Sequence, residues 1–282
     1  MKLPRRTFLQ SGLAASTVAA LAAVDVRAAA APAAASGSRE YYELRSYRMK
    51  PGASRAPLDT YLEKALIPAL NKRGIANVGV FTELEVTRTP GTDPTSKPKV
   101  DSPVWVLMAH PSLDSFQQVS LDLNNDPAVL EAGAAYLQVD RANAAFDRID
   151  SYLLISFTSS PKMTVPPHSR QRTPGRIFEM RTYDSYSEIK ALKKVQMFNA
   201  GEVPIMQEVG LAPIFFGQAI AGRDLPQLTY ITSGTDLVSH FKHWDGFNNH
   251  PEWVKLRADP QYANTVSKNT SRFLEATSYS QL

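Results

Sequence analysis

The sequence has no cysteine among its 282 residues, and this absence excludes several kinds of protein. Disulfide scaffolds, zinc ribbons and iron–sulfur proteins all need thiols, and so does a cysteine nucleophile. With 43% hydrophobic and 21% charged residues, the composition also excludes collagen-like, coiled-coil and wholly disordered chains. The length fits one large domain or two small ones, each big enough for its own core.

Three motifs that carry chemistry are absent as well. No Gly-x-Gly-x-x-Gly follows a predicted strand, and no Gly-x-x-x-x-Gly-Lys loop is present to hold phosphates. No Gly-x-Ser-x-Gly nucleophile elbow occurs. We therefore expect neither a nucleotide cofactor nor serine-hydrolase chemistry.

Excess charge is confined to the N-terminus. Four of the 31 basic residues and one of the 27 acidic residues lie within residues 1–31, which leaves 27 and 26 and a net charge of +1 for the rest. A nearly neutral chain has no electrostatic footprint for nucleic acid or for an anionic membrane. We therefore expect no nucleic-acid partner.

The N-terminal segment is typical of a bacterial Tat export signal. Arg5 and Arg6 form a twin-arginine pair, an uncharged Ala-rich stretch covers Phe8–Val24, and a run of alanines follows for cleavage. That stretch is short and interrupted for a permanent span, and no later one approaches transmembrane length. We predict a cleaved signal over residues 1–31, a disordered tether over residues 32–38, and a periplasmic or extracellular protein. An uncleaved anchor stays open as the alternative.

The rest of the chain repeats itself. Residues 42–47 (Tyr-Glu-Leu-Arg-Ser-Tyr) read like residues 178–183 (Phe-Glu-Met-Arg-Thr-Tyr), and the same offset of 136 aligns residues 67–70 with residues 203–206. Such matches in order indicate an internal duplication. Two later matches occur at offsets of 124 and 127: residues 124–127 with 248–251, and residues 151–152 with 278–279.

Because the offset falls from 136 to 124, the first copy carries about twelve extra residues. A run rich in Pro and Gly over residues 87–103 predicts an extended loop there. We therefore divide the chain into a first domain at residues 39–158, a Pro-rich linker at residues 159–175 and a second domain at residues 176–282.

Each copy predicts the order β-α-β-β-α-β. Apolar spacing from Leu58 to Ala69 indicates an amphipathic first helix, and residues 187–208 form its less regular counterpart. Pro68 and Pro204 lie within these helices and are expected to kink or end them. The strands are expected at 41–49, 77–86, 104–108 and 149–157 in the first copy, and at 177–183, 212–221, 227–232 and 273–279 in the second.

This order predicts an α+β fold made of two ferredoxin-like modules. Two helices cover one face of each four-stranded antiparallel sheet, so the other, partly apolar face needs a partner. The second copy supplies it, and the two sheets facing each other predict an intrachain barrel with the helices outside.

Four segments of the second copy resemble a known family. They are residues 178–183, His-Trp-Asp-Gly-Phe at 243–247, Pro-Glu-Trp at 251–253 and Ser-Tyr-Ser at 278–280. Together they resemble the NIPSNAP family of the dimeric α+β barrel superfamily. The first copy resembles it more loosely, with Val129 where the second has Trp253. The resemblance implies the barrel and the pairing of the copies. The superfamily includes binding proteins, monooxygenases and haem-handling enzymes, so it does not imply one reaction.

Candidate ligand-binding residues alternate along the first strand of each copy and so share one face. Because their neighbours are more apolar and should meet the helices, we expect these side chains to point into the barrel. Buried charges should pair there. They form either a polar floor for a carboxylate or carbonyl ligand or a structural ion-pair network. The residues are Glu43, Arg45, Tyr47, Glu179, Arg181 and Tyr183.

Aromatic residues and histidines gather near the second helix of the second copy. Trp244, Phe247 and Trp253 form either a satellite core or the wall of an apolar pocket. His243, beside them, is a further candidate ligand-binding residue. His240, His243 and His250 could hold a metal or haem iron, but they lack the usual i, i+4 spacing with Glu. We therefore predict no metal site and no cofactor, and keep haem or a metal ion as the less favoured alternative.

Two function classes remain. The first is an exported binding or interaction protein that holds a small apolar molecule or a protein partner, with no assignable reaction. The alternative is a barrel enzyme, monooxygenase-like or haem-handling, that acts on a small aromatic or polyketide-like substrate. No catalytic residue is assigned, and a homo-oligomer stays open.

Overall fold

Each half of the chain contributes four barrel strands. The computed structural model describes residues 38–282, so the predicted signal sequence lies outside the described residues. The first module has β1 (Tyr41–Met49), β2 (Gly79–Thr87), β4 (Val104–His110) and β5 (Phe146–Ser156). The second has β6 (Ile177–Asp184), β7 (Ala212–Ala221), β8 (Gln227–Gly234) and β9 (Lys268–Ala276). In both modules the third barrel strand lies between the first two, as in ferredoxin-like folds.

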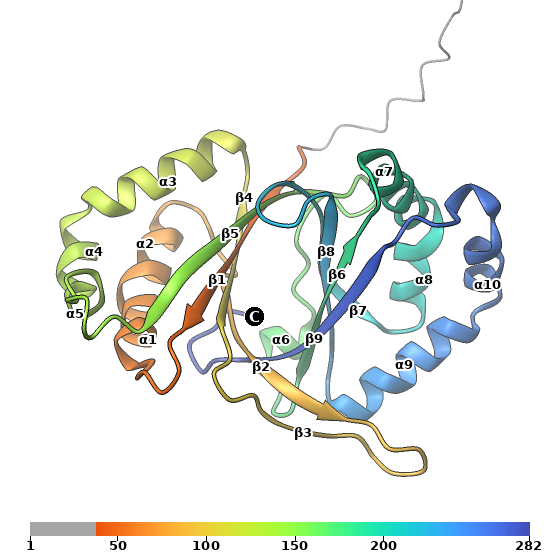
Figure 1. Ribbon diagram of the computed structural model, residues 1–282, viewed down its shortest axis with the longest axis horizontal. Helices are drawn as coiled ribbons and strands as arrows, with labels where there is room; N and C mark the ends of the chain where they lie inside the picture. The colour runs from red at the N-terminus through yellow and green to blue at the C-terminus, as the bar shows by residue number, and fades with distance from the viewer. Residues whose placement is uncertain (1–37) are drawn as a thin grey trace, which may run out of the picture. The chain divides into compact units, whose positions relative to one another are not determined.

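The two sheets close into one barrel through two seams. β5 pairs with β7, and β2 pairs with β9, both antiparallel. Eight strands thus form a closed antiparallel barrel with a helical layer on either side (Figure 1). The predicted α+β class and intrachain barrel are confirmed, and the sheets are also hydrogen-bonded edge to edge.

The helices occur in matching sets. The first module has α1 (Ala56–Tyr61), η1 (Leu62–Leu66), α2 (Ile67–Lys72), α3 (Leu113–Asn125), α4 (Pro127–Ala132) and α5 (Ala134–Leu137). The second has α7 (Glu188–Met197), η2 (Phe198–Glu202), α8 (Val203–Glu208), α9 (Leu237–Asn249), α10 (Pro251–Ala258) and η3 (Pro260–Tyr262). Among residues 38–282, no helix has the length and apolar character needed to cross a bilayer.

A π-helical turn precedes the proline of each long helix. η1 and η2 are π-helical, and Pro68 and Pro204 stand in the first turn of the α-helical segment that follows. Proline lacks the N–H that an uninterrupted α-helix needs at this place. The wider turn accommodates that loss, and the helix continues rather than ends.

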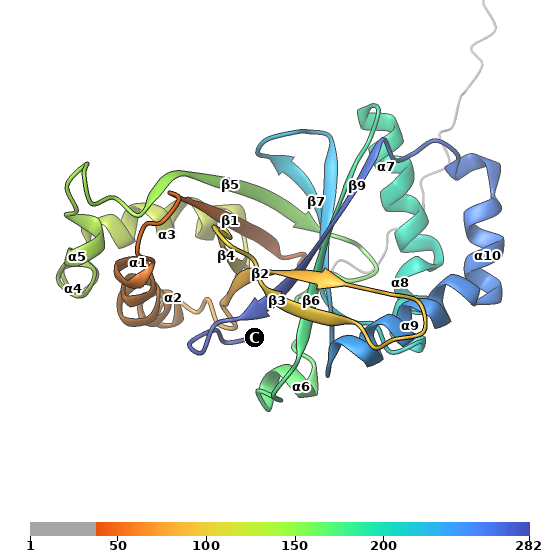
Figure 2. The same ribbon diagram turned by 60° about the horizontal axis from the view of Figure 1, so that its bottom comes forward.

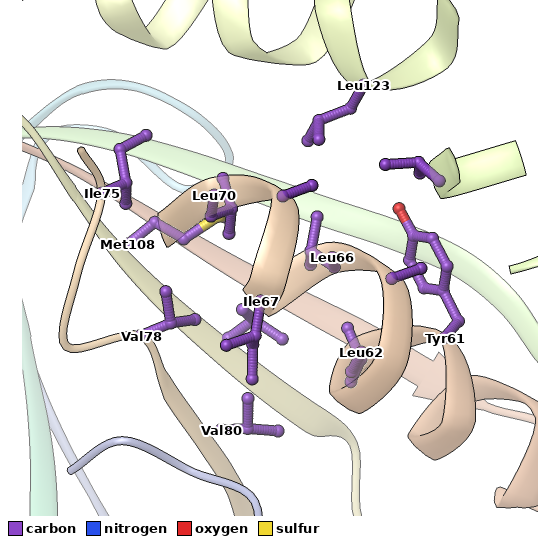
Figure 3. Close-up of a cluster of buried hydrophobic side chains, with 14 of the residues drawn as sticks. Tyr61, Leu62, Leu66, Ile67, Leu70, Ile75, Val78, Val80, Met108 and Leu123 are labelled. Carbon is purple, nitrogen blue, oxygen red and sulfur yellow. The ribbon is translucent and has the colours of Figure 1, made fainter. Parts of the chain in front are cut away.

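Three apolar clusters hold the fold together. One lies between the first module's sheet and its helices and includes Leu62, Leu66 and Ile67 (Figure 3). Another fills the barrel with side chains from both modules, and a third lies under α7, α8 and α9.

The cluster inside the barrel contradicts the expected strand faces. Leu44 and Met180 belong to this interior cluster, whereas Tyr47 and Tyr183 belong to the clusters under the helices. The Glu-Arg-Tyr set therefore faces outward, beneath the helical layer. The physical reason is that a closed barrel shuts water out of its interior, while the helical layer has margins where a polar side chain reaches solvent.

Two connecting segments also differ from expectation. Within the 87–103 loop, β3 (Thr95–Pro98) pairs with β2, so the insertion is a hairpin that runs toward α9 (Figure 2). The linker contains the short helix α6 (Pro167–Arg170). Its Val165 packs in the interior cluster of the barrel, so the linker is anchored to the barrel.

The expected match of residues 151–152 with 278–279 is wrong. Strand pairing sets Arg45 opposite Ser151 and Arg181 opposite Ser271, so Ser271 is the counterpart of Ser151. Residues 278–279 lie beyond β9, in a tail whose Gln281 N–H donates to the Val78 carbonyl. A Ser-Tyr pair was too short a match to fix the register.

Candidate ligand pocket of the second module

A pocket of about 550 Å³ opens between the outer face of the second sheet and the helices α7, α9 and α10. Its charged lining residues are Arg88, Glu179, Arg181, Lys194 and Glu202. Six aromatic side chains and two amides complete most of the wall: Tyr183, Phe241, Trp244, Phe247, Trp253, Phe273, Asn248 and Asn269. The pocket is therefore both aromatic and charged.

Glu179 forms the floor of this pocket. Its carboxylate accepts hydrogen bonds from Arg181 Nη1 (2.9 Å), Trp244 Nε1 (2.5 Å) and Ser271 Oγ (2.5 Å), and His240 Nε2 lies 2.9 Å away. Burial opposes ionisation of the carboxyl. The bond from His240 and the charge of Arg181 outweigh it and lower the pKa of Glu179 to about 2. Glu179 is therefore a fixed anion.

Arg181 stays charged beside it. Burial opposes the charge, but the neighbouring Tyr230, Tyr183 and Glu179 raise the pKa of Arg181 overall. Its guanidinium carbon lies 4.6 Å from the Trp244 ring centroid, a cation–π distance. The cation–π contact and the ion pair together hold the guanidinium at the wall of the pocket.

A second ion pair lies deeper on the helical side. Lys194 Nζ donates to Glu202 at 2.8 Å, and these side chains are only 7% and 2% exposed. The ammonium group also lies 4.7 Å from the Phe198 ring centroid. Burial raises the pKa of Glu202, although Lys194 opposes that rise. The π-helical turn η2 ends at Glu202 and so positions this carboxyl.

The first module contributes Arg88 to the rim. Arg88 Nη2 donates to both carboxylate oxygens of Asp245 on α9, at 2.8 and 3.1 Å. Its guanidinium carbon lies 4.7 Å from the centroid of the Phe241 ring. The hairpin that follows β2 thus reaches across to the second module, and the pocket wall comes from both halves of the chain.

The first module repeats the floor with a different histidine. Glu43 accepts from Arg45 Nε (2.5 Å) and Ser151 Oγ (2.8 Å), and His110 Nε2 lies 3.8 Å from its carboxylate. Burial opposes ionisation of this carboxyl, but the nearby His110 imidazole and the charge of Arg45 overcome it and lower the pKa of Glu43 to about 2.

The two imidazoles come from different elements. His110 ends β4, and its ring meets the ring of Phe116 on α3 edge-on. In the second module, Gly234 stands at the position of His110 and His240 at the position of Phe116, at the offset of 124. A Cβ at Gly234 would lie 3.1 Å from His240 Cβ, so glycine leaves the room that the imidazole on α9 needs. In each module an imidazole therefore lies near the buried carboxylate, although it comes from a different element.

The first module does not repeat the charged wall. At the matching positions it has buried Leu58 and Leu66 in place of Lys194 and Glu202. Tyr136 stacks on Tyr61 at 4.6 Å and meets Tyr47 edge-on, so aromatic side chains cover its floor. The same polar floor is therefore packed over in one module and lines a pocket in the other.

The sequence-predicted residues are brought together only in part. Glu179, Arg181, Tyr183, Trp244 and Trp253 all line the pocket. His243 does not, because its ring packs against Gly210. Glu43, Arg45 and Tyr47 form the counterpart floor in the first module.

The three histidines do not form a metal site. His240 faces Glu179, the ring of His243 packs against Gly210, and His250 Nε2 lies 3.5 Å from Glu208. Within residues 38–282, no group of three metal-ligating side chains is present. Among the described residues, none that lines the pocket is a histidine, so the wall they form offers no imidazole ligand for haem iron.

Sequence reasoning missed Lys194, Glu202 and Arg88. A signal for the first two existed, since the repeat places leucines opposite both and the periodicity of residues 187–208 is irregular. Arg88 had no such signal, because the sequence of a loop does not show which helix the loop will contact.

A closed barrel of two ferredoxin-like modules, with helices outside, is the architecture of dimeric α+β barrel proteins. Within the chain, residues 178–281 match the NIPSNAP family. This match covers the module that has the pocket.

Two solved structures share the whole architecture at low sequence identity. A "putative monooxygenase" from Fusobacterium nucleatum is 9% identical with a TM-score of 0.51, over 86% of this chain and 94% of its own. Another "putative monooxygenase", from Lactobacillus acidophilus, is 6% identical with a TM-score of 0.52, over 84% and 94%. A NIPSNAP-like domain protein from Burkholderia xenovorans is 22% identical with a TM-score of 0.34, over 38% and 89%. No curated protein matches the chain.

Proposed function

We propose that this chain is an exported binding protein and that its second module holds a small organic molecule in the pocket above Glu179. The observation that carries this proposal is the difference between the modules. The same polar floor is covered by Tyr136 and Tyr61 in the first and lines a pocket of about 550 Å³ in the second. That volume lies within the range of ligand sites, roughly 300–1,000 Å³.

The energetics of the wall favour a ligand role. Leucines at the positions of Lys194 and Glu202 are compatible with this fold, because the first module has them at Leu58 and Leu66. A buried ion pair is often no more stabilising than apolar residues of similar volume. Charges retained beside an open pocket are therefore better explained by what the pocket holds. The polar wall also changes the expected occupant from an apolar molecule to one with both a planar apolar part and polar groups.

Two matched serine variants test the proposal. Ser271→Leu and Ser151→Leu remove equivalent hydrogen bonds to Glu179 and Glu43, but only Ser271 lines the pocket. We expect native mass spectrometry to detect a retained ligand in the exported chain and in Ser151→Leu, but not in Ser271→Leu. Tryptophan fluorescence should follow rebinding, since Trp244 and Trp253 line the site. Equal binding by both variants, or no small molecule bound at all, would contradict the proposal.

An enzyme acting on a small aromatic or polyketide-like substrate is the second candidate. Glu202 favours it, because a buried carboxyl with a raised pKa beside an ammonium group suits proton transfer. The two similar structures described as monooxygenases agree with this candidate. Oxygen uptake with a polycyclic phenol, lost in Glu202→Gln while the phenol still binds, would favour the enzyme over the binding protein.

A further inference from the structure

The charges around the pocket indicate which ligands it takes. Of its charged lining residues within the part of the chain that the structure describes, Glu179 pairs with Arg181 and Glu202 pairs with Lys194. Each pair is close to neutral. Arg88 is the remaining charged residue among these described lining residues, and its partner Asp245 does not line the pocket.

Arg88 is also placed to change partners. Its side chain is 51% exposed and that of Asp245 is 54% exposed. Ion pairs this exposed contribute little free energy, because water and salt screen them. The Phe241 ring, 4.7 Å from the guanidinium carbon, can hold Arg88 at the rim while its N–H groups turn to another acceptor.

The walls define the other half of the ligand. Trp244, Trp253 and Phe247 line the pocket on the helix side, and Phe273 lines it from β9. Flat aromatic rings stack on such walls with offset or edge-on geometry. A molecule that satisfies both features has an aromatic body and an acidic group at one end.

We infer that the pocket selects planar aromatic anions, such as aryl carboxylates, and that Arg88 of the first module's hairpin is the residue that recognises the acidic group. This inference rests on the proposed function, and it adds the ligand's charge and the residue that selects it. On binding, the carboxylate accepts hydrogen bonds from Arg88, which leaves Asp245 to solvent.

Binding of 2-naphthoate and its neutral analogue 2-naphthamide to the full chain, measured by isothermal titration calorimetry, tests the inference. The native chain should bind the carboxylate about tenfold more tightly than the amide, the effect of one charge-assisted contact. Arg88→Gln should bring the two affinities close to each other by weakening naphthoate alone. Asp245→Asn should tighten naphthoate binding about threefold, because it frees Arg88 from its competitor.

Arg223→Gln is the matched control. Arg223 is 55% exposed and pairs with Asp150 away from the pocket, so the variant changes net charge equally and should leave both affinities unchanged. Equal binding of the two probes by the native chain, or a carboxylate preference that survives Arg88→Gln, overturns the inference and leaves the proposed function standing. If neither probe binds, the inference falls, and ligand retention in native mass spectrometry decides the proposed function separately.

Discussion

A carboxylate under a helical layer must be held by several donors, and Glu179 and Glu43 show how this is done twice in one chain. Each receives an arginine two residues along its own strand and a serine from the neighbouring strand. The histidine comes from a different element in each module, and Glu179 also accepts from Trp244. The floor is therefore defined by the carboxylate and the groups that reach it rather than by fixed sequence positions.

Because of this arrangement, the free energy of unfolding should vary with pH in the acid range. Since the folded-state pKa of Glu179 is about 2 against an ordinary value of 4.5, its ionised form stabilises the fold above pH 4.5. The contribution, roughly 3 kcal/mol, is lost as pH falls from about 4.5 to 2. We expect urea unfolding to show this decline in the native chain and a shallower one in Glu179→Gln.

Glu63→Gln is the control for that measurement. Glu63 is exposed and pairs on the surface with Lys64, so its replacement should leave the native slope between pH 4.5 and 2 in place. A slope in Glu179→Gln as steep as the native one would show that the buried carboxylate is not the source.

At the scale of elements, η2 and the helix before it build the charged wall. Lys194 on α7 and Glu202 at the end of η2 lie within one continuous helical stretch. The first module builds the same stretch with leucines, so the fold tolerates either chemistry. What distinguishes the modules is therefore side chains on a shared backbone.

Exchanging this wall for its counterpart should separate stability from binding. Lys194→Leu alone leaves the buried Glu202 carboxyl without its ion-pair partner and should destabilise the chain by roughly 3 kcal/mol. Lys194→Leu with Glu202→Leu should recover that loss in thermal melts and abolish ligand retention. A double variant that is as unstable as the single one, or that still binds, would show that the pair has another role.

How much of this was predictable differs between elements. Strands β1 and β7 begin and end where the pattern predicts, and the Glu43–Arg45 and Glu179–Arg181 pairs form as expected. Alternation along a strand shows which side chains share a face, but not which face meets the barrel interior. That choice depends on how completely the second sheet closes the barrel, which is a property of both modules together.

At the scale of the whole molecule, export is the open proposal, because residues 1–37 lie outside the described part of the structure. We propose that Arg5 and Arg6 direct the folded chain through the Tat pathway. Arg5→Lys with Arg6→Lys should leave the protein uncleaved in the cytoplasm, as cell fractionation and intact mass would show. Delivery unchanged by both substitutions would count against this route.

Joining both modules in one chain removes a restriction that symmetry imposes. In a homodimeric barrel every substitution appears twice, so a pocket can be neither closed nor covered on one side alone. Here a single gene encodes two modules that have become unlike. Leu58 and Leu66 fill one side, and the hairpin carrying Arg88 covers the other. The barrel thus combines a module whose polar floor is packed over with one whose floor lines a pocket, a combination that two identical subunits cannot form.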